Sequence, residues 1–329
     1  MPVAPQRKLS AASAPTAVGA RGVPATGTAP GAWSGAGSRQ GFGATERGDA
    51  WWFKPVLQAA GLIVLIGYAN YAAFLGAAHY RYLENGRDYL SPFYSPYIHP
   101  AWLPVWLSPA LLILVFPLGF RATCYYYRKA YYRSFFADPI ACAVGEPRQA
   151  YCGEVKFPFL LQNLHRYFLY AALVFLVILW IDVVKAFIFS APALAAAAPA
   201  VTSALGLHAA REAASGGHYL AIGGGSLAIL FSTGMLTLYT LSCHSLRHLV
   251  GGKLDCFSCA AAGGPRHKTW SIVTVLNGHH MAWAWWSLFA VCFADFLVRM
   301  CSIGVIHDPT LATFRHLLEM PNRSLSLLR

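Results

Sequence analysis

Charged residues are scarce in this chain of 329 residues: only 12% of its side chains are charged, and only 13 are acidic. Soluble domains carry about 25% charged residues, so this chain has too little charge to cover a water-facing surface of its size. Hydrophobic residues make up 57% of the sequence, and its mean hydropathy is +0.45. The composition therefore argues against an ordinary soluble protein and predicts a multi-span membrane protein.

Several cofactor-binding motifs are also missing. The sequence contains no G-x-G-x-x-G, no Walker A motif, no repeated ferredoxin-like C-x-x-C-x-x-C and no C-x-x-C-H for covalent haem. A flavin domain or a ferredoxin domain would therefore have to belong to another chain.

Five apolar stretches are long enough to cross a bilayer, which requires about 20 residues each. They run from about 55 to 79, 102 to 124, 167 to 189, 219 to 241 and 272 to 303. We expect the fourth helix to continue to His248, and the triplet Gly223–Gly225 at its start to permit close packing. The predicted fold is an all-α integral membrane bundle of five transmembrane helices.

The segments outside the spans complete the predicted organisation. Residues 1–50 are rich in Ala, Gly, Ser, Pro and Thr and predict a disordered N-terminal tail. Residues 51–304 form the membrane domain, and 305–329 form an extension on the outer side. The outer loop 80–101 is rich in Pro and aromatic residues, so we expect it to be structured.

The basic residues indicate the orientation of the chain. The net charge is +12, from 25 Lys and Arg against 13 Asp and Glu. A cytoplasmic N-terminus places 17 of the 25 basic residues on the inner side and the other 8 outside, as the positive-inside rule requires. The positive charge thus indicates the topology of the chain and a basic inner surface for lipid head groups or docked proteins. It does not indicate nucleic-acid binding.

Thiols and imidazoles gather at the predicted inner face, a composition that suits iron–sulfur ligation. The inner cysteines are Cys124, Cys142, Cys152, Cys243, Cys256 and Cys259. We do not expect disulfides among them, because the cytoplasm is reducing. His244 and His248 are four residues apart, so on a helix they share one face and could bind one metal, or else contact lipid phosphates.

Other polar residues lie within the predicted spans. His165 and His280 are close to the inner leaflet, where each could hold a quinone carbonyl or simply be an interfacial histidine. Asp182 with Lys185, and Asp295 with Arg299, are spaced so that each pair can close on one helix face and lower the cost of insertion.

Several long motifs resemble the membrane anchor of succinate dehydrogenase, in particular the single-chain, five-helix type of actinobacteria. They span roughly residues 51–304 and read RATCYYYRKAYYRSFF, PIACAVGEP, FPFLLQNLHRYFLY, CHSLRHLVGG, HMAWAWWSLF and FADFLVR. The resemblance implies a complex in which a flavoprotein subunit oxidises succinate and an iron–sulfur subunit relays the electrons. This chain would pass them to quinone in the bacterial cytoplasmic membrane, without a complete active site of its own. The resemblance leaves a higher oligomer open.

The same resemblance implies a Rieske-type [2Fe–2S] cluster with two Cys and two His ligands in place of haem b. It assigns the imidazoles to His244 and His248 and the thiolates to Cys124 and Cys142. Cys243 is the rival thiolate, and the C-x-x-C pair Cys256 and Cys259 ranks third. The candidate quinone contacts are Tyr126, His165, Arg247, His280 and Trp283.

Two alternatives are compatible with the residues. A b-type dihaem anchor could draw on outer histidines (His79, His99, His218) and inner ones (His165, His244, His280). A small transporter or scaffold would instead show discontinuous helices around a central polar site. The third apolar stretch is unbroken and the polar residues gather at the inner face, which argues against the second alternative.

Overall fold

The computed structural model describes most of the chain outside its two ends. The described residues are 41–75, 78–83, 86–104, 107–137, 140–147, 157, 159–190, 218–252, 254 and 256–314. They all belong to one compact unit, Gly41–Arg329. The predictions for residues 1–40, Cys152 and residues 315–329 lie outside the described part.

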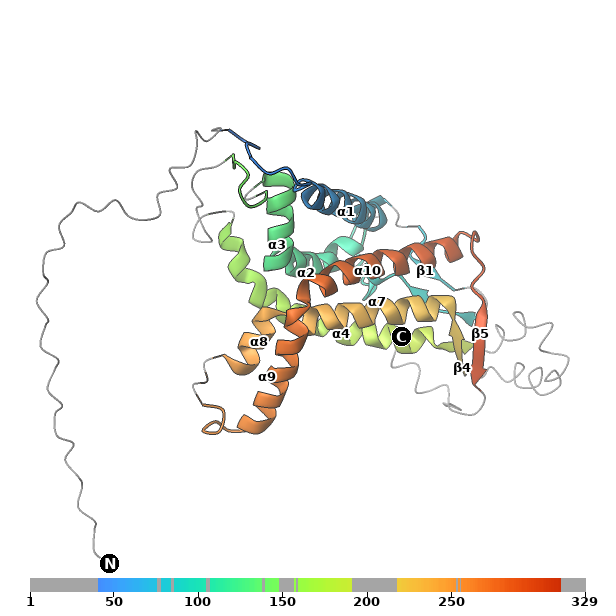
Figure 1. The fold of residues 1–329 in the computed structure, drawn as a ribbon. Helices are drawn as coiled ribbons and strands as arrows, with labels where there is room; N and C mark the ends of the chain where they lie inside the picture. Colours follow the sequence, from blue (N-terminus) through green and yellow to red (C-terminus); the bar gives the residue numbers. More distant parts are fainter. Residues whose placement is uncertain are drawn as a thin grey trace, which may run out of the picture. The chain divides into compact units, whose positions relative to one another are not determined.

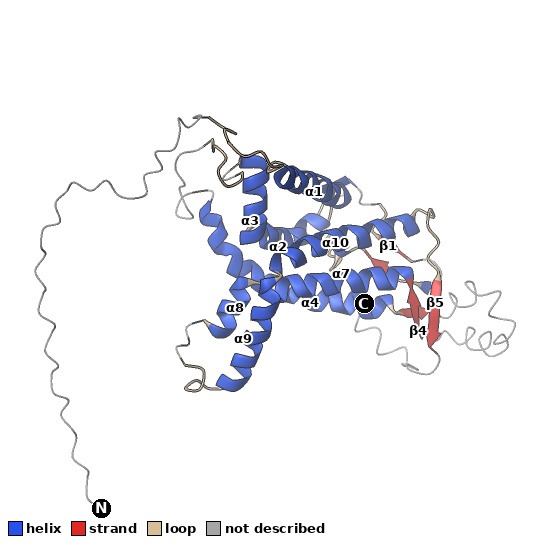
Figure 2. Ribbon diagram, viewed as in Figure 1, coloured by secondary structure: helices blue, strands red, loops and turns tan. Residues whose placement is uncertain are grey.

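Helices dominate the described residues, as Figures 1 and 2 show. The long helices are α1 (Phe53–Asn70), α2 (Ala110–Ala122), α4 (His165–Ala186), α7 (Gly224–Leu241), α9 (Gly263–Gly278) and α10 (His280–Ser302). The shorter ones are η1 (Tyr71–Leu75), η3 (Pro92–Tyr94), α3 (Tyr125–Tyr131), η4 (Tyr132–Phe136), η6 (Phe159–Leu164) and α8 (His244–Gly251).

Four helical segments of the described part are long and apolar enough to cross a membrane: Phe53–Phe74, Leu160–Ala186, Gly224–Leu241 and His280–Ser302. A fifth span is formed if the bent pair Ala110–Ala122 and Tyr125–Phe136, which meet at 78°, counts as one. The predicted helical membrane bundle is therefore confirmed.

The structure interrupts two helices that the sequence predicts to be continuous. The predicted continuation of the fourth helix to His248 is wrong, because Cys243 has an extended backbone (φ −62°, ψ 135°) between α7 and α8. The predicted fifth span divides at His279 into α9 and α10, directly after Gly278. The side-chain amide of Asn277 donates to the carbonyl of Ser242 (2.8 Å), so the two breaks lie against each other.

The second predicted span is also broken and begins later than expected. Its helix starts at Ala110 rather than near Trp102, directly after Pro109. It ends before Cys124, whose backbone is extended (φ −67°, ψ 129°). Thr123 donates its hydroxyl hydrogen to the carbonyl of Gly119 (2.7 Å), which satisfies a carbonyl at this helix end.

Helix α10 packs against α7, and α4 packs against both α7 and α2. In Figure 1, α7 and α10 run side by side, while α8 and α9 form a separate hairpin. The main core cluster brings together buried residues of several spans, among them Leu62, Phe120, Leu169, Tyr239 and Leu288.

Small sheets close the outer end of the bundle. Strands β1 (Arg81–Tyr82) and β2 (Tyr89–Leu90) pair antiparallel, with Arg81 opposite Leu90. Strand β4 (His218–Gly223) lies between β3 (Ile188–Ser190) and β5 (Thr310–Phe314), again antiparallel. The outer loop is thus structured, as predicted, and part of the C-terminal extension belongs to a sheet.

A buried ion pair joins these outer segments to α7. Arg87 Nε lies 3.0 Å from Asp308 Oδ2, and both side chains are only 2% exposed. Asp308 also accepts hydrogen bonds from the Tyr89 hydroxyl (2.8 Å) and from the Gly225 backbone N–H (2.9 Å). A Cβ atom on Gly225 would lie 2.3 Å from the Tyr89 ring, so close packing explains this glycine, as predicted.

The two acid–base pairs of the spans also close as the spacing predicts. Arg299 donates from Nε to Asp295 Oδ2 (2.7 Å), and Lys185 Nζ lies 3.8 Å from Asp182 Oδ1. Asp295 is fully buried and receives a further hydrogen bond from the Tyr68 hydroxyl (2.7 Å). These contacts neutralise the charge and tie α1 to α10.

Residues 41–50 differ from the predicted tail. Gly43 N–H donates to the carbonyl of Gly145 (2.9 Å), and Gly145 N–H donates to the carbonyl of Ala44 (2.8 Å). Thr45 adds a hydrogen bond to the carbonyl of Ala143 (2.7 Å). This part of the predicted tail is therefore attached to the inner loop.

Candidate functional site

Two cysteines and two histidines lie where helices begin, and three of the four lie at the breaks described above. Cys124 directly precedes α3, and Cys243 directly precedes α8. His165 and His280 are the first residues of α4 and α10. Cys124, Cys243 and His280 are almost fully buried, at 2%, 1% and 2% exposure, and His165 is half-buried.

Each cysteine faces the histidine of another span. Cys124 Sγ lies 3.5 Å from His280 Nε2, and Cys243 Sγ lies 3.2 Å from His165 Nε2. Each of the two Cys–His pairs therefore joins two helices.

A hydroxyl group fixes the other nitrogen of each imidazole. Thr123 Oγ1 lies 2.9 Å from His165 Nδ1, and Ser242 Oγ lies 2.6 Å from His280 Nδ1. Thr123 directly precedes Cys124 but contacts His165, the histidine of the other pair. Ser242 directly precedes Cys243 but contacts His280. This reciprocal arrangement turns both Nε2 atoms toward sulfur, as outer hydrogen bonds commonly orient histidine ligands.

A row of aromatic rings connects the two pairs. Phe120 stacks on His165 with 4.7 Å between ring centroids, and Tyr239 stacks on His280 at 5.0 Å. Phe120 and Tyr239 themselves meet edge to face at 5.4 Å. The two pairs are thus neighbours in one buried layer near the predicted inner face.

The donor set can be compared with that of a Rieske-type cluster. Within the part of the chain that the structure describes, no three His, Cys, Asp or Glu side chains converge on one metal position. Two thiols and two imidazoles are the ligands of a Rieske-type [2Fe–2S] cluster, which shares them between two irons. The residues present therefore fit such a cluster in kind and in number.

Most of the ligands predicted from the sequence lie elsewhere. Cys142 is exposed, and its carbonyl accepts a hydrogen bond from Arg47 (2.8 Å). His244 and His248 are exposed on α8, where His248 Nδ1 lies 3.4 Å from Arg166 Nη2. Of the predicted set, only Cys124 and the rival Cys243 belong to the Cys–His pairs.

The C-x-x-C pair differs from expectation in another way. Cys256 and Cys259 form a disulfide, so the expectation that no inner cysteines are bridged is wrong for these two. In this state neither sulfur is available as a thiolate ligand.

The predicted quinone contacts separate into three groups. His165 and His280 belong to the Cys–His pairs. The Tyr126 ring lies 5.1 Å from that of His280, and the indole N–H of Trp283 is buried without a hydrogen-bond partner among the described residues. Arg247 instead donates to the Thr274 hydroxyl of α9 (2.9 Å).

Two outer histidines of the haem alternative, His79 and His99, have other partners among the described residues. His79 is exposed, with Nδ1 3.4 Å from Ser302 Oγ. His99 is exposed and stacks on Tyr97. The side chain of His218 lies outside the described part of the chain.

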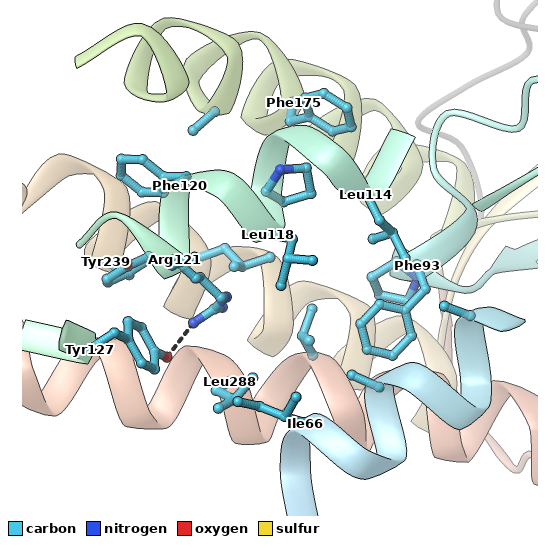
Figure 3. A pocket seen from close by; sticks show the side chains of 18 of the residues that line it. Ile66, Phe93, Leu114, Leu118, Phe120, Arg121, Tyr127, Phe175, Tyr239 and Leu288 are labelled. Atoms are coloured by element: carbon cyan, nitrogen blue, oxygen red, sulfur yellow. Dashed lines mark hydrogen bonds between the residues drawn. The ribbon is translucent and has the colours of Figure 1, made fainter. Parts of the chain in front are cut away.

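Figure 3 shows an apolar cavity of about 290 Å³ between the helices. Residues of α1, α2, α4, α7 and α10 line it, and Phe120 and Tyr239 belong both to its wall and to the row of aromatic rings. The sequence analysis did not find this cavity, because it depends on how the helices pack.

Arg121 provides the polar end of the cavity. It donates hydrogen bonds to the Tyr127 hydroxyl (2.5 Å) and to the Ser287 hydroxyl (3.1 Å), and its guanidinium lies 5.0 Å from the Tyr239 ring centroid. Among the described residues Arg121 has no carboxylate partner. Figure 3 shows it beside Tyr127 and Tyr239, on the same side of the cavity.

Thr123, Ser242, Tyr239 and Arg121 were not among the residues singled out from the sequence. For Thr123 and Ser242 the sequence carries one indication, because each directly precedes a cysteine, in R-A-T-C-Y and in L-S-C-H. The role of each hydroxyl depends on a histidine in a distant segment, so the dipeptides alone do not reveal it.

Comparison with known proteins agrees with this architecture. Residues 53–201 and 194–304 match the family model described as actinobacterial succinate dehydrogenase subunit SdhC. Among solved structures, the chain is similar to one from the Mycobacterium smegmatis Sdh1 complex in the apo form. The two are 37% identical with a TM-score of 0.65, over 80% of this chain and 92% of that chain. A search of curated proteins found no match.

Proposed function

Because the chain belongs to the actinobacterial family of succinate dehydrogenase membrane anchors, we propose that it carries electrons from a soluble iron–sulfur subunit to quinone. A flavoprotein subunit supplies the electrons by oxidising succinate, and the bacterial cytoplasmic membrane holds the complex. The two soluble subunits dock on the inner side, where the basic loops and the α8–α9 hairpin lie. Family membership removes the transporter and scaffold alternatives.

The reciprocal Cys–His pairs are the observation that carries this proposal. They favour Cys124, Cys243, His165 and His280 as the ligands of a Rieske-type [2Fe–2S] cluster, in place of the set with Cys142, His244 and His248. When bound, such a cluster exchanges single electrons at about −150 to +300 mV, a range suited to quinone reduction.

The surrounding residues prepare the site in three ways. Thr123 and Ser242 hold the Nδ1 atoms, so that both imidazoles present Nε2. The helix breaks place Cys124 and Cys243 directly before α3 and α8, where each sulfur faces a histidine of another helix. Burial of both cysteines keeps water away from the sulfur atoms.

The hydroxyl of Tyr239 supports the site further. It is buried, faces the Cys124 thiol and makes no hydrogen bond of ordinary geometry within the described part of the chain. Hydrogen bonds to cluster sulfurs are among the factors that set the potential. Tyr239 is therefore a positioning residue for electron transfer to quinone.

A quinone ring can bind at two places next to the Cys–His pairs. One is the side of His280 where Tyr126 lies, together with the Trp283 indole, whose N–H has no partner among the residues that the structure describes. The other is the Arg121 end of the cavity, beside Tyr239. Both offer hydrogen-bond donors to a quinone carbonyl.

Spectroscopy of the purified complex tests the cofactor. In its reduced state, a Rieske-type cluster gives an EPR signal with a low average g value. If the cluster is present in place of haem, we expect no sharp b-type bands in the visible spectrum. Stoichiometric haem with those bands would contradict the cluster and favour the dihaem alternative.

A Ser242→Ala variant should weaken the site without removing a ligand. We expect cluster occupancy or quinone reduction to fall about 10- to 100-fold, because the His280 ring loses the hydroxyl that orients it. Iron content and the EPR signal per complex measure the effect. Ser258→Ala, in the exposed inner loop, serves as a control and should leave both unchanged.

A Cys256→Ser/Cys259→Ser double variant separates the disulfide from the cluster. We expect the EPR signal to persist and quinone reduction to change by less than about twofold, as for a surface substitution. Loss of the signal in an assembled complex would return this C-x-x-C pair to the set of candidate ligands.

A further inference from the structure

We propose that the junction between α1 and η4, at the predicted inner face, binds the headgroup of an anionic phospholipid. Arg133 and Ser134 of η4 hold the phosphate, and Gln58 of α1 accepts a hydrogen bond from the rest of the headgroup. None of these three residues lines the cavity described above or belongs to a Cys–His pair. The inference goes beyond the proposed function, because it requires neither a cluster nor a quinone.

Polar atoms without partners are the first argument. Arg133 Nε, Ser134 Oγ and Gln58 Oε1 are all buried and have no hydrogen-bond partner among the described residues. Buried polar groups of folded proteins are nearly always hydrogen-bonded. Three such atoms on two neighbouring elements therefore point to a polar ligand.

The packing of the two elements is the second argument. Both η4 and α3, which directly precedes it, contact α1. Gln58 lies three residues after Pro55 and four before Leu62, and both are buried, so Gln58 is on the packed face of α1. Arg133 and Ser134 are consecutive residues of η4. Figure 1 shows the start of α1 beside α3, at one end of the bundle, so one headgroup at this junction contacts both elements.

The charges and donors at the junction select a phosphate. Within the described part of the chain Arg133 forms no ion pair, whereas the nearby Arg128 lies over the Tyr125 ring, 5.0 Å from its centroid. The guanidinium of Arg133 and the hydroxyl of Ser134 donate hydrogen bonds, which phosphate oxygens accept. Lys54 is exposed one turn before Gln58 and adds a second positive charge. The junction therefore favours a headgroup with a net negative charge.

The position of the junction favours a lipid over a soluble phosphate. Gln58 is about 7.5 Å along α1 from Phe53, the first residue of this membrane-spanning helix. Trp52, Phe53 and Phe135 are 51%, 57% and 50% exposed around it, and aromatic side chains gather at membrane interfaces. An acyl chain attached to the headgroup can pack along the exposed side of α1, where Leu57 lies.

The acceptor on α1 specifies the headgroup further. The side-chain oxygen of Gln58 can only accept a hydrogen bond, so the headgroup must carry a donor. A glycerol hydroxyl provides one, whereas a choline group has none. The ligand class is therefore an anionic phospholipid with a hydroxyl-bearing headgroup, for which phosphatidylglycerol is the probe.

Lipid binding to the purified, delipidated complex tests the site. Phosphatidylglycerol and phosphatidylcholine with the same acyl chains are titrated, and native mass spectrometry measures the affinity. We expect the wild-type complex to bind phosphatidylglycerol about tenfold more tightly, and Arg133→Gln/Ser134→Ala to weaken its binding about 10- to 100-fold, because hydrogen bonds to a charged phosphate are lost. The control Lys268→Gln/Thr269→Ala removes a cation and a hydroxyl from exposed positions of α9 and should change the affinity by less than about twofold.

A second variant tests the headgroup without touching the phosphate contacts. Gln58→Met should weaken phosphatidylglycerol binding about fivefold and leave phosphatidylcholine binding unchanged, because only the acceptor for the hydroxyl is lost. This variant keeps both positive charges of the junction, so it still decides the question if Arg133→Gln/Ser134→Ala does not assemble.

Four results would overturn the lipid site. They are equal binding of the two lipids by the wild-type complex, the same loss in the α9 control, an unchanged lipid preference in Gln58→Met, and displacement of the lipid by an equal concentration of inorganic phosphate. The last result would assign the junction to a soluble anion. Unchanged lipid binding in Arg133→Gln/Ser134→Ala, with loss of the soluble iron–sulfur subunit from the complex, would instead make the junction a protein-docking surface.

Discussion

A His165→Ala/His280→Ala double variant is expected to lose the EPR signal of the cluster and to lower quinone reduction by at least about 100-fold. Loss of an outer hydrogen bond to a metal ligand already costs about 10- to 100-fold, and this variant removes two ligands. Succinate oxidation with a soluble artificial acceptor should persist, because the flavoprotein subunit is unchanged. Both rates and the EPR spectrum are measured on the purified complex.

The matched control is His244→Ala/His248→Ala, which removes the two histidines that the sequence favours. Both are exposed on α8 and neither lies in a Cys–His pair, so we expect the signal to remain and the activity to change by less than about twofold. The opposite result, with loss of the signal only in this control, would restore His244 and His248 as ligands.

An Asp308→Ala variant is expected to destabilise the chain by about 3–5 kcal/mol, the cost of leaving one partner of a buried ion pair uncompensated. Arg87 would keep its charge at 2% exposure, and the Tyr89 hydroxyl and the Gly225 N–H would lose their acceptor. Because these groups join the outer loop, α7 and the C-terminal segment, thermal unfolding of the purified complex should begin at a lower temperature.

The exposed pair Arg81–Asp88 provides the control for this change. Its side chains are 43% and 38% exposed, so Asp88→Ala should cost less than about 1 kcal/mol. If the two variants destabilise the complex equally, the buried pair does not have the role that its burial suggests.

Sequence alone was sufficient for the properties that depend on local composition. Apolar length identified the membrane spans, whereas the orientation indicated by the distribution of Lys and Arg stays a prediction. The spacings of Asp182 with Lys185 and of Asp295 with Arg299 predicted both ion pairs, because each pair lies within one helix. Long motifs identified the family for the same reason, since they are read along the chain.

Only the tertiary structure decided which polar side chains meet. Cys124 and His280 are 156 residues apart, and His165 and Cys243 are 78 apart, so no spacing rule connects them. His244 and His248 satisfied the spacing rule for one helix face, but both side chains are exposed on α8, which begins after the break at Cys243. The sequence determined that thiols and imidazoles would gather near the inner face. Helix breaks and packing selected four of them, because a shared site requires side chains from different helices to converge.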